Sequence, residues 1–194
     1  MSSPSSAYAL VEDQRHRQFI YRFLVQAGIN RNRITVAVSP SGVGSGKQWV
    51  RKNYALQVEV CRRRNTKTST CLLAVMDADQ LTVAKCIDEL DASLASANQP
   101  KLNPAKDPIA RLIPKWSVET WILYLTATGD SRLPIREDQP YKDSKTHEQW
   151  SELVPKAAVA LFEWSRRTAA LPANPLDSLR CGIEEIPRVL PPER

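Results

Sequence analysis

Histidine and cysteine are scarce in this sequence, and their spacing excludes a zinc site. The two histidines, His16 and His147, lie far apart, and the four cysteines form neither a CxxC pair nor any other metal-ligand spacing. We therefore expect each histidine to be exposed or hydrogen-bonded, and Cys71 and Cys86 to be buried free thiols. Free thiols favour a reducing, cytoplasmic setting.

The sequence also lacks any apolar run long enough to span a bilayer, so we expect no membrane association. The residues Met1 to Ser6 include neither a charged nor an apolar segment, and we expect no secretory signal there. With 194 residues, 42% of them hydrophobic and 25% charged, the chain suits one globular domain or one domain with an appendage.

Positive charge is present in excess, and it is unevenly distributed. The formal net charge is +6, and between Gly46 and Lys67 seven basic residues stand against one acid, Glu59. A clustered basic face favours a polyanionic partner, most commonly nucleic acid, although a solvated helix face without a partner is the alternative. The residues expected to bind nucleic acid are Lys47, Arg51, Lys52, Arg62, Arg63 and Arg64.

Apolar or β-branched runs alternate with helical periodicities along the chain. The expected strands are 7–12, 33–38, 71–76 and 109–113. The expected helices are 13–28, 47–64, 81–94, 117–125, 150–167 and 176–190. We expect Asp13 and Ser117 to act as N-caps and Pro155 to mark the entry to its helix. The segment 128–145 is polar and rich in turn residues.

This alternation predicts an α/β fold with a four-stranded, mainly parallel sheet flanked by helices and right-handed crossovers. Residues 7–127 would form the main domain, and residues 128–194 a connection and a helical extension that packs on it. Within that extension Leu153, Ala157, Leu161 and Trp164 form an apolar stripe. We expect the stripe to pack inside its own chain, and a homodimer is the alternative.

Carboxylates follow two of the expected strands. The apolar run from Thr70 to Met76 ends in Asp77 and Asp79, whose side chains point to the same side of an extended chain. Glu12 ends the first strand, and parallel strands present their ligands at their carboxyl ends. Because Mg²⁺ and Mn²⁺ prefer such oxygens, we expect these three acids to hold one of them. The alternative is an Asp-rich turn and helix cap.

Other charged residues follow the second and fourth strands. Lys115 and Glu119 come after the fourth, where the lysine would hold phosphate and the acid, like Asp13, would serve a second metal or proton transfer. The loop 41–46 precedes Lys47 and is similar to a Walker A loop, but Ser41 and Gln48 replace required residues, so we expect no ATPase. It would instead hold a phosphate backbone or be a mobile surface loop.

Taken together, Val11-Glu12, Asp77-x-Asp79 and the charged motif after the fourth strand resemble the Toprim catalytic fold of OLD-like nucleases and of small stand-alone relatives. The segment from Pro114 to Trp121 is similar to a Pro-x-x-x-x-Glu-x-Trp stretch of the stand-alone branch. The resemblance covers residues 7–127, and Asp13 stands where those proteins usually have glycine. It implies a Toprim/Rossmann-like sheet and a Mg²⁺- or Mn²⁺-dependent nuclease.

The resemblance assigns Mg²⁺ to the Asp77-x-Asp79 pair and acid/base or metal work to Glu12. It also implies an ABC-type ATPase partner in trans and a role in defence against phage or plasmids. Two other functions stay open. One is a non-enzymatic subunit that binds nucleic acid or a partner. The other is a Mg²⁺-dependent phosphatase or phosphotransferase, because Asp77 to Leu81 approaches an Asp-x-Asp-x-Thr motif with leucine in place of threonine.

Overall fold

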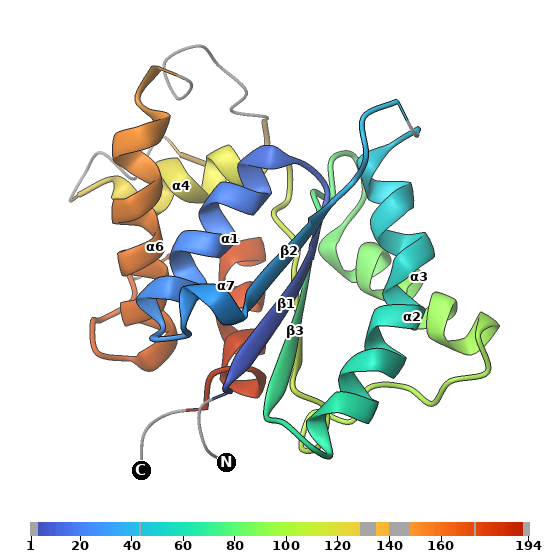
Figure 1. The fold of residues 1–194 in the computed structure, drawn as a ribbon. Helices are drawn as coiled ribbons and strands as arrows, with labels where there is room; N and C mark the ends of the chain where they lie inside the picture. The colour runs from blue at the N-terminus through green and yellow to red at the C-terminus, as the bar shows by residue number, and fades with distance from the viewer. Residues whose placement is uncertain (1–3, 43, 129–134, 140–147, 173, 192–194) are drawn as a thin grey trace.

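The computed structural model of this protein describes residues 4–42, 44–128, 135–139, 148–172 and 174–191. His147 and most of the polar segment 128–145 lie outside these ranges. Within them, four strands form one sheet with helices on both faces (Figure 1). The predicted α/β, Rossmann-like fold is confirmed, and the sheet is parallel throughout.

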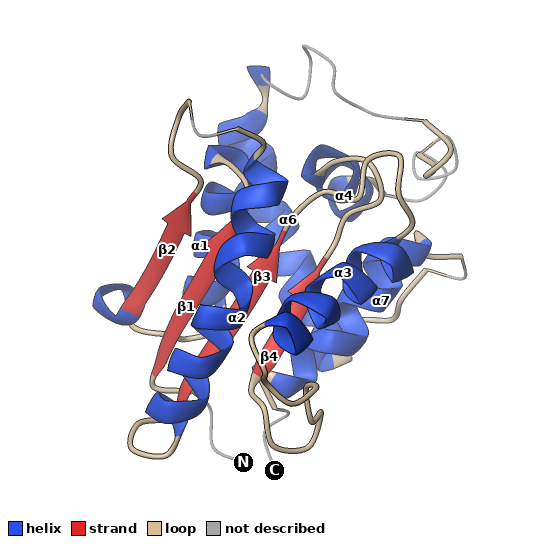
Figure 2. Cartoon of the chain, turned by 90° about the vertical axis from the view of Figure 1, so that its right-hand side faces the viewer, coloured by secondary structure: helices blue, strands red, loops and turns tan. Residues whose placement is uncertain are grey.

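The strands lie side by side in the order β2-β1-β3-β4, as Figure 2 shows. Each begins and ends within one residue of its predicted range. Every residue of β3 is buried, because helices cover both faces of this central strand and leave it no polar side. The strands are β1 (Ser6–Val11), β2 (Ile34–Val38), β3 (Thr70–Val75) and β4 (Ile109–Leu112).

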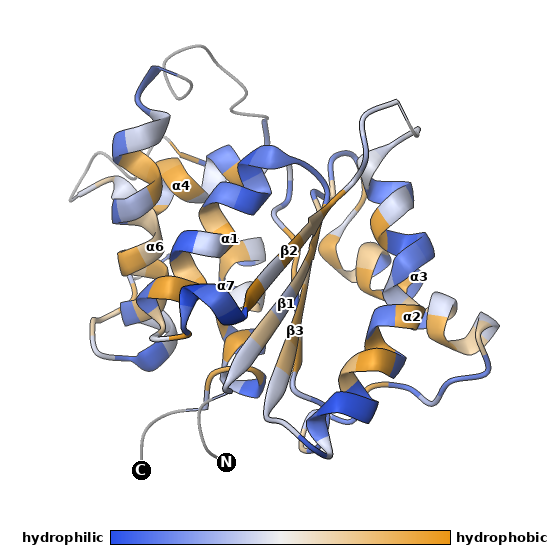
Figure 3. Cartoon of the chain, viewed as in Figure 1, coloured by the Kyte–Doolittle hydropathy of each residue, from blue (hydrophilic) through white to orange (hydrophobic). Residues whose placement is uncertain are grey.

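The helices form two layers, and Figure 3 shows their hydrophobic residues turned toward the sheet. One layer packs on alternate strand residues such as Val11 and Leu73, and the other on their neighbours such as Leu10 and Leu72. The first layer consists of α1 (Gln14–Gln26), α4 (Val118–Thr126), α6 (Trp150–Arg166) and α7 (Asp177–Glu185). The second consists of α2 (Gly46–Asn65) and α3 (Val83–Ser96).

Two predicted helix boundaries and the predicted role of Pro155 as a helix entry were wrong. Helix α3 begins after Thr82, whose hydroxyl accepts a hydrogen bond from the backbone N–H of Lys85. Pro155 lies inside α6, which begins at Trp150. The last predicted helix ends at Glu185, and the chain continues as a 3₁₀ turn. The α-helix stops there because Pro187 has no backbone N–H to donate a helical hydrogen bond.

The apolar stripe of α6 packs inside its own chain, as predicted. Ala157, Leu161 and Trp164 are buried in the same core as the strands, and Leu153 is partly buried against it. The stripe therefore offers no surface for a second copy of the chain.

The strand order creates a switch point between β1 and β3. The chain leaves β1 through α1 on one face to reach β2, then crosses through α2 on the other face to reach β3. In sheets of this kind, ligands bind in the crevice outside the carboxyl ends of the strands. The crevice lies where successive strands stop being added on one side of the sheet and begin to be added on the other. The predicted acids after β1 and β3 lie at this edge.

Candidate active site at the β1/β3 edge

Two of the predicted acids, Glu12 and Asp77, meet at the switch point. Val11 and Val75 are neighbours in the register of β1 and β3, so the residues that follow them emerge side by side. The backbone N–H of Asp77 donates a hydrogen bond to Oε2 of Glu12 at 3.1 Å. Burial raises the pKa of Glu12, and the negative charge of Asp77 raises it further.

Asp77 is also held by His16, a residue for which we expected an exposed or hydrogen-bonding position. The imidazole is fully buried and bonded at both nitrogens. Its Nε2 lies 3.0 Å from Oδ1 of Asp77, and its Nδ1 lies 2.8 Å from Oδ1 of Asp13. Burial alone would lower the pKa of His16, but Asp77 and Asp13 raise it well above its usual range.

Asp13 serves two purposes at the start of α1. It is the N-cap, as predicted, and its carboxylate accepts hydrogen bonds from the backbone N–H groups of Arg15 and His16. The same oxygen contacts the ring of His16. Burial would raise the pKa of Asp13, but these bonds to His16 hold it below its usual range. Asp13, His16 and Asp77 thus form a continuous chain of polar contacts.

Asp79 lies in a left-handed turn that two lysines hold. Its φ of 52° costs a non-glycine residue roughly 1 kcal/mol or more. Nζ of Lys47 donates to Oδ2 of Asp79 at 2.7 Å and to the carbonyl of Ala78 at 3.0 Å. Nζ of Lys115 donates to the carbonyls of Asp79 at 2.6 Å and Leu81 at 2.8 Å. Both predicted phosphate-binding lysines therefore lie at the expected edge and brace the turn.

The loop before Lys47 ends at Gly46, whose backbone lies against Glu12. At Gly46, the first residue of α2, an added Cβ would lie 2.5 Å from Cγ and 2.7 Å from the backbone oxygen of Glu12. Only glycine fits this distance without a shift in the backbone. The N-terminus of α2 is therefore packed directly against Glu12, as α1 begins directly after it.

Glu119 lies at the start of α4, where it is buried and forms an ion pair with Arg15 of α1. The nearby hydroxyls of Ser117 and Thr120 are buried too, and neither has a hydrogen-bond partner among the described residues. Ser117 occupies the predicted N-cap position without the predicted side-chain cap bond. The part of Glu119 in proton transfer stays a prediction.

Apart from Lys47, the predicted nucleic-acid-binding residues of α2 show no contact with the carboxylates in the described part of the chain. Arg51 forms an ion pair with Glu89 of α3. Arg62 donates to Asp107 at 2.9 Å and to the carbonyls of two loop residues, so its role is structural. Arg63 and Arg64 are exposed at the far end of α2, about 25 Å from Lys47 at 1.5 Å per residue.

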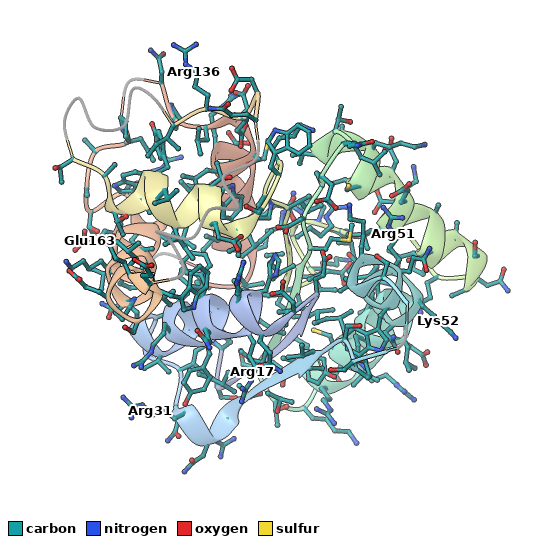
Figure 4. All side chains as sticks on the ribbon, turned by 90° about the horizontal axis from the view of Figure 1, so that it is seen from above. Arg17, Arg31, Arg51, Lys52, Arg136 and Glu163 are labelled. Atoms are coloured by element: carbon teal, nitrogen blue, oxygen red, sulfur yellow. The ribbon has the colours of Figure 1, made fainter. Side chains whose placement is uncertain are left out.

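Figure 4 looks down on the carboxyl edge of the sheet and shows how the cationic side chains divide. Arg51 and Lys52 project from α2 on one side of the sheet. Arg17 and Arg31 project on the other side, near α1. Cationic side chains therefore project on both sides of the sheet.

The predicted metal ligands are the carboxylates of Glu12, Asp77 and Asp79, and their arrangement decides whether an ion fits. Across the described ranges, no three His, Cys, Asp or Glu side chains are arranged to hold one. Asp77 faces His16 and Asp79 faces Lys47. Glu12, Asp77 and Asp79 nevertheless each supply only oxygen, which is the donor that Mg²⁺ and Mn²⁺ prefer.

Comparisons with protein-family models, with curated proteins and with solved structures gave no match to this chain. The resemblance to Toprim proteins therefore stays a prediction. None of the helices in the described part of the chain combines the length and apolar character needed to cross a bilayer.

Proposed function

We propose that this protein is a Mg²⁺- or Mn²⁺-dependent nuclease of the Toprim type that hydrolyses phosphodiester bonds in DNA or RNA. The observation that supports this best is the contact between Glu12 and Asp77 at the switch point between β1 and β3. This hydrogen bond runs from the backbone N–H of Asp77 to the carboxylate of Glu12, so it brings the two acids to the same edge. The negative charge of Asp77 raises the pKa of Glu12, and a divalent cation at this edge would relieve that repulsion.

Glu12, Asp77 and Asp79 would hold the ion. When bound, it would neutralise charge on the phosphoryl oxygens and make a bound water more acidic. Binding at Asp79 requires this carboxylate to exchange Lys47 for the ion, which leaves the ammonium group to bind phosphate at the same edge. Glu12, whose pKa is raised, would either complete the metal site or, when it is not bound to the ion, accept and release a proton at its carboxylate.

Asp13 and His16 act as positioning residues in this proposal. His16 fixes the orientation of the Asp77 carboxylate, and Asp13 fixes the ring of His16. A partner that orients a metal-binding side chain commonly changes metal affinity or activity by about 10- to 100-fold when it is removed.

The proposal includes a partner and a biological role. The resemblance implies an ABC-type ATPase that acts in trans and a place in defence against phage or plasmids. The surface that contacts this subunit would then lie outside the β1/β3 edge.

Calorimetric titration with Mn²⁺ tests the metal site. The wild type should bind, and Asp77→Ala/Asp79→Ala should not. A matched control, Asp88→Ala/Glu184→Ala, removes two exposed acids elsewhere and should bind as the wild type does. Cleavage of labelled DNA and RNA is then measured with Mg²⁺ or Mn²⁺, with and without the ATPase. Absence of both binding and cleavage under all these conditions would overturn the proposal.

A second candidate is a non-enzymatic subunit that binds nucleic acid or a partner. A hollow of about 740 Å³ at the amino ends of β1 and β3 favours it, because Arg63, Arg64 and Lys67 line it. In this case Asp77→Ala would leave function intact, and charge reversal at Arg63 and Arg64 would abolish it.

A further inference from the structure

A groove between α1 and α6 lies close to the β1/β3 edge. Its volume is about 430 Å³, which is within the usual range for a small-molecule site. Among the residues that the structure describes, its walls carry three arginines and two aromatic rings and no acid. The residues that matter here are Arg17, Tyr21, Arg22, Arg31, Trp150 and Ser151.

The arginines of the groove are available to an anion. Arg17, Arg22 and Arg31 are all exposed. Within the described part of the chain, the side chains of Arg22 and Arg31 form no ion pair or hydrogen bond, and Arg17 has only a long bond of 3.4 Å to Gln14. Arginines without an internal partner suit the oxygens of a phosphate backbone.

The aromatic rings of the groove are held in place. Trp150 is partly buried, and its indole N–H donates to Oε1 of Gln18. The guanidinium of Arg15 lies 5.8 Å from the centre of the Trp150 ring. Tyr21, on the next turn of α1, is also partly buried. Trp150, which its neighbours hold in place, and the partly buried Tyr21 thus lie among cationic side chains, a combination on which nucleobases stack.

Pro155 explains a further property of this wall. Proline has no backbone N–H, so the carbonyl of Ser151, four residues earlier, lacks its helical donor. Ser151 and Pro155 both line the groove.

The groove is joined to the candidate active site by Arg15. This side chain forms an ion pair with Glu119 and lies over Trp150. Arg17, on the groove, directly follows His16, which contacts Asp77. A strand that occupied the groove would thus lie against α1, the helix whose first turn also contacts the carboxylate edge.

We propose that this groove binds unpaired nucleotides of a single-stranded nucleic acid, with bases on Tyr21 and Trp150 and phosphates on the three arginines. A single strand is favoured over a duplex because a base pair inside a helix stack offers no free face to the rings. A groove of this volume also suits a nucleotide rather than a duplex. The inference rests on the proposed function, since it names the substrate form of that same site.

Binding is measured by fluorescence anisotropy with labelled 12-nucleotide oligo(dT), its RNA equivalent and a duplex of equal length. EDTA is present throughout, so that the result does not depend on metal or cleavage. Trp150→Leu should weaken single-strand binding by about 5- to 100-fold, whereas Trp150→Tyr should stay within about threefold because it keeps a stacking ring. This conservative variant separates lost stacking from lost packing.

The arginines are tested through the salt dependence of binding. Arg22→Ala/Arg31→Ala should reduce the slope of log affinity against log salt by about 1.4, since each phosphate contact on a single strand contributes about 0.7. Lys101→Ala/Lys106→Ala is the matched control, because it removes two exposed charges from another loop and should leave the slope unchanged.

Two results would overturn the inference: equal affinity for duplex and single strand, or wild-type affinity in both groove variants. The nuclease proposal fails separately. If Asp77→Ala/Asp79→Ala and the wild type bind the strand equally well and neither cuts it with Mn²⁺ and the ATPase, the groove stands as a binding site and the nuclease does not. If the groove variants cleave the strand as the wild type does, the nuclease stands and the groove does not.

Discussion

The imidazole of His16 and the carboxylate of Asp77 lie 3.0 Å apart, although 61 positions separate them in the sequence. The contact joins the first turn of α1 to the segment that follows β3, at the switch point between β1 and β3. It places an opposite charge beside a buried acid and at the same time fixes the orientation of its carboxylate.

His16→Gln should be strongly destabilising. Removal of the imidazole leaves the buried carboxylate of Asp77 without its cationic partner, which typically costs about 3–5 kcal/mol. The free energy of unfolding in urea measures the effect. Gln14→Ala, on the exposed side of the same helical turn, should change it by less than about 0.5 kcal/mol. A similarly small change in His16→Gln would show that the contact contributes no stability.

The cost of His16→Gln should depend on pH. The folded pKa of His16 is raised, so its stabilisation is fully present below the unfolded value near 6.5 and is lost as pH rises through the folded value. The pKa of Asp13 is lowered, so its contribution is present above about 3.8 and is lost as pH falls. The difference in unfolding free energy between wild type and variant should therefore be larger at pH 5.5 than at pH 9. A difference that grows with pH would mean that the buried ring is neutral.

Gly46→Ala should disturb the carboxylate edge. The new methyl group would meet the backbone oxygen of Glu12 at 2.7 Å, so one of the two chains must move. We expect a loss of about 1–3 kcal/mol in unfolding free energy and weaker Mn²⁺ binding in calorimetry. Gln48→Ala, exposed on the first turn of the same helix, is the control. Unchanged stability and metal affinity in Gly46→Ala would contradict the close packing of α2 on Glu12.

Arg62 and Arg63 should behave differently although they are adjacent. Arg62→Ala removes charge-assisted bonds to Asp107, so unfolding free energy should fall by about 1.5–3 kcal/mol. Arg63→Ala removes an exposed side chain and should cost less than about 0.5 kcal/mol. Thermal and urea denaturation compare the two variants. Equal losses would mean that the Arg62 contacts are not what anchors the loop before β4.

Lys47→Met should separate metal binding from catalysis. In the wild type, Asp79 must give up its bond to Lys47 before it can bind the ion. The variant has no such bond to break, so Mn²⁺ should bind about fivefold more tightly. Cleavage should nevertheless fall, because the phosphate loses a cation. Lys52→Met, exposed one turn further along α2, controls for the loss of charge. Weaker Mn²⁺ binding in Lys47→Met alone would show that Lys47 supports the site and does not compete with the ion.

The strands and most helices could be predicted because their signals are local. Apolar runs before Glu12 and Asp77 located β1 and β3 to within a residue, and Asp13 was identified as a cap from its place before a periodic helix. Pro155 was misplaced because proline usually marks a helix start, whereas here tertiary packing of α6 keeps the helix continuous across it.

The contacts within the site could not be predicted in the same way. The proximity of Glu12 to Asp77 depends on β3 lying beside β1, which no local pattern encodes. The burial of His16 depends on how α1 is rotated against the sheet. A partial signal was present, because His16 follows the cap Asp13 by three positions, where a side chain returns toward the cap. The lysines' bonds to the Asp77–Leu81 turn depend on a left-handed residue, Asp79, that aspartate only sometimes adopts.

Glu12 lies where α1 and α2 both begin, and these helices cover opposite faces of the sheet. The two helical layers therefore meet the carboxylates from separate sides and share little else. Substitutions on the outer surface of either layer should thus leave the acids between them in place.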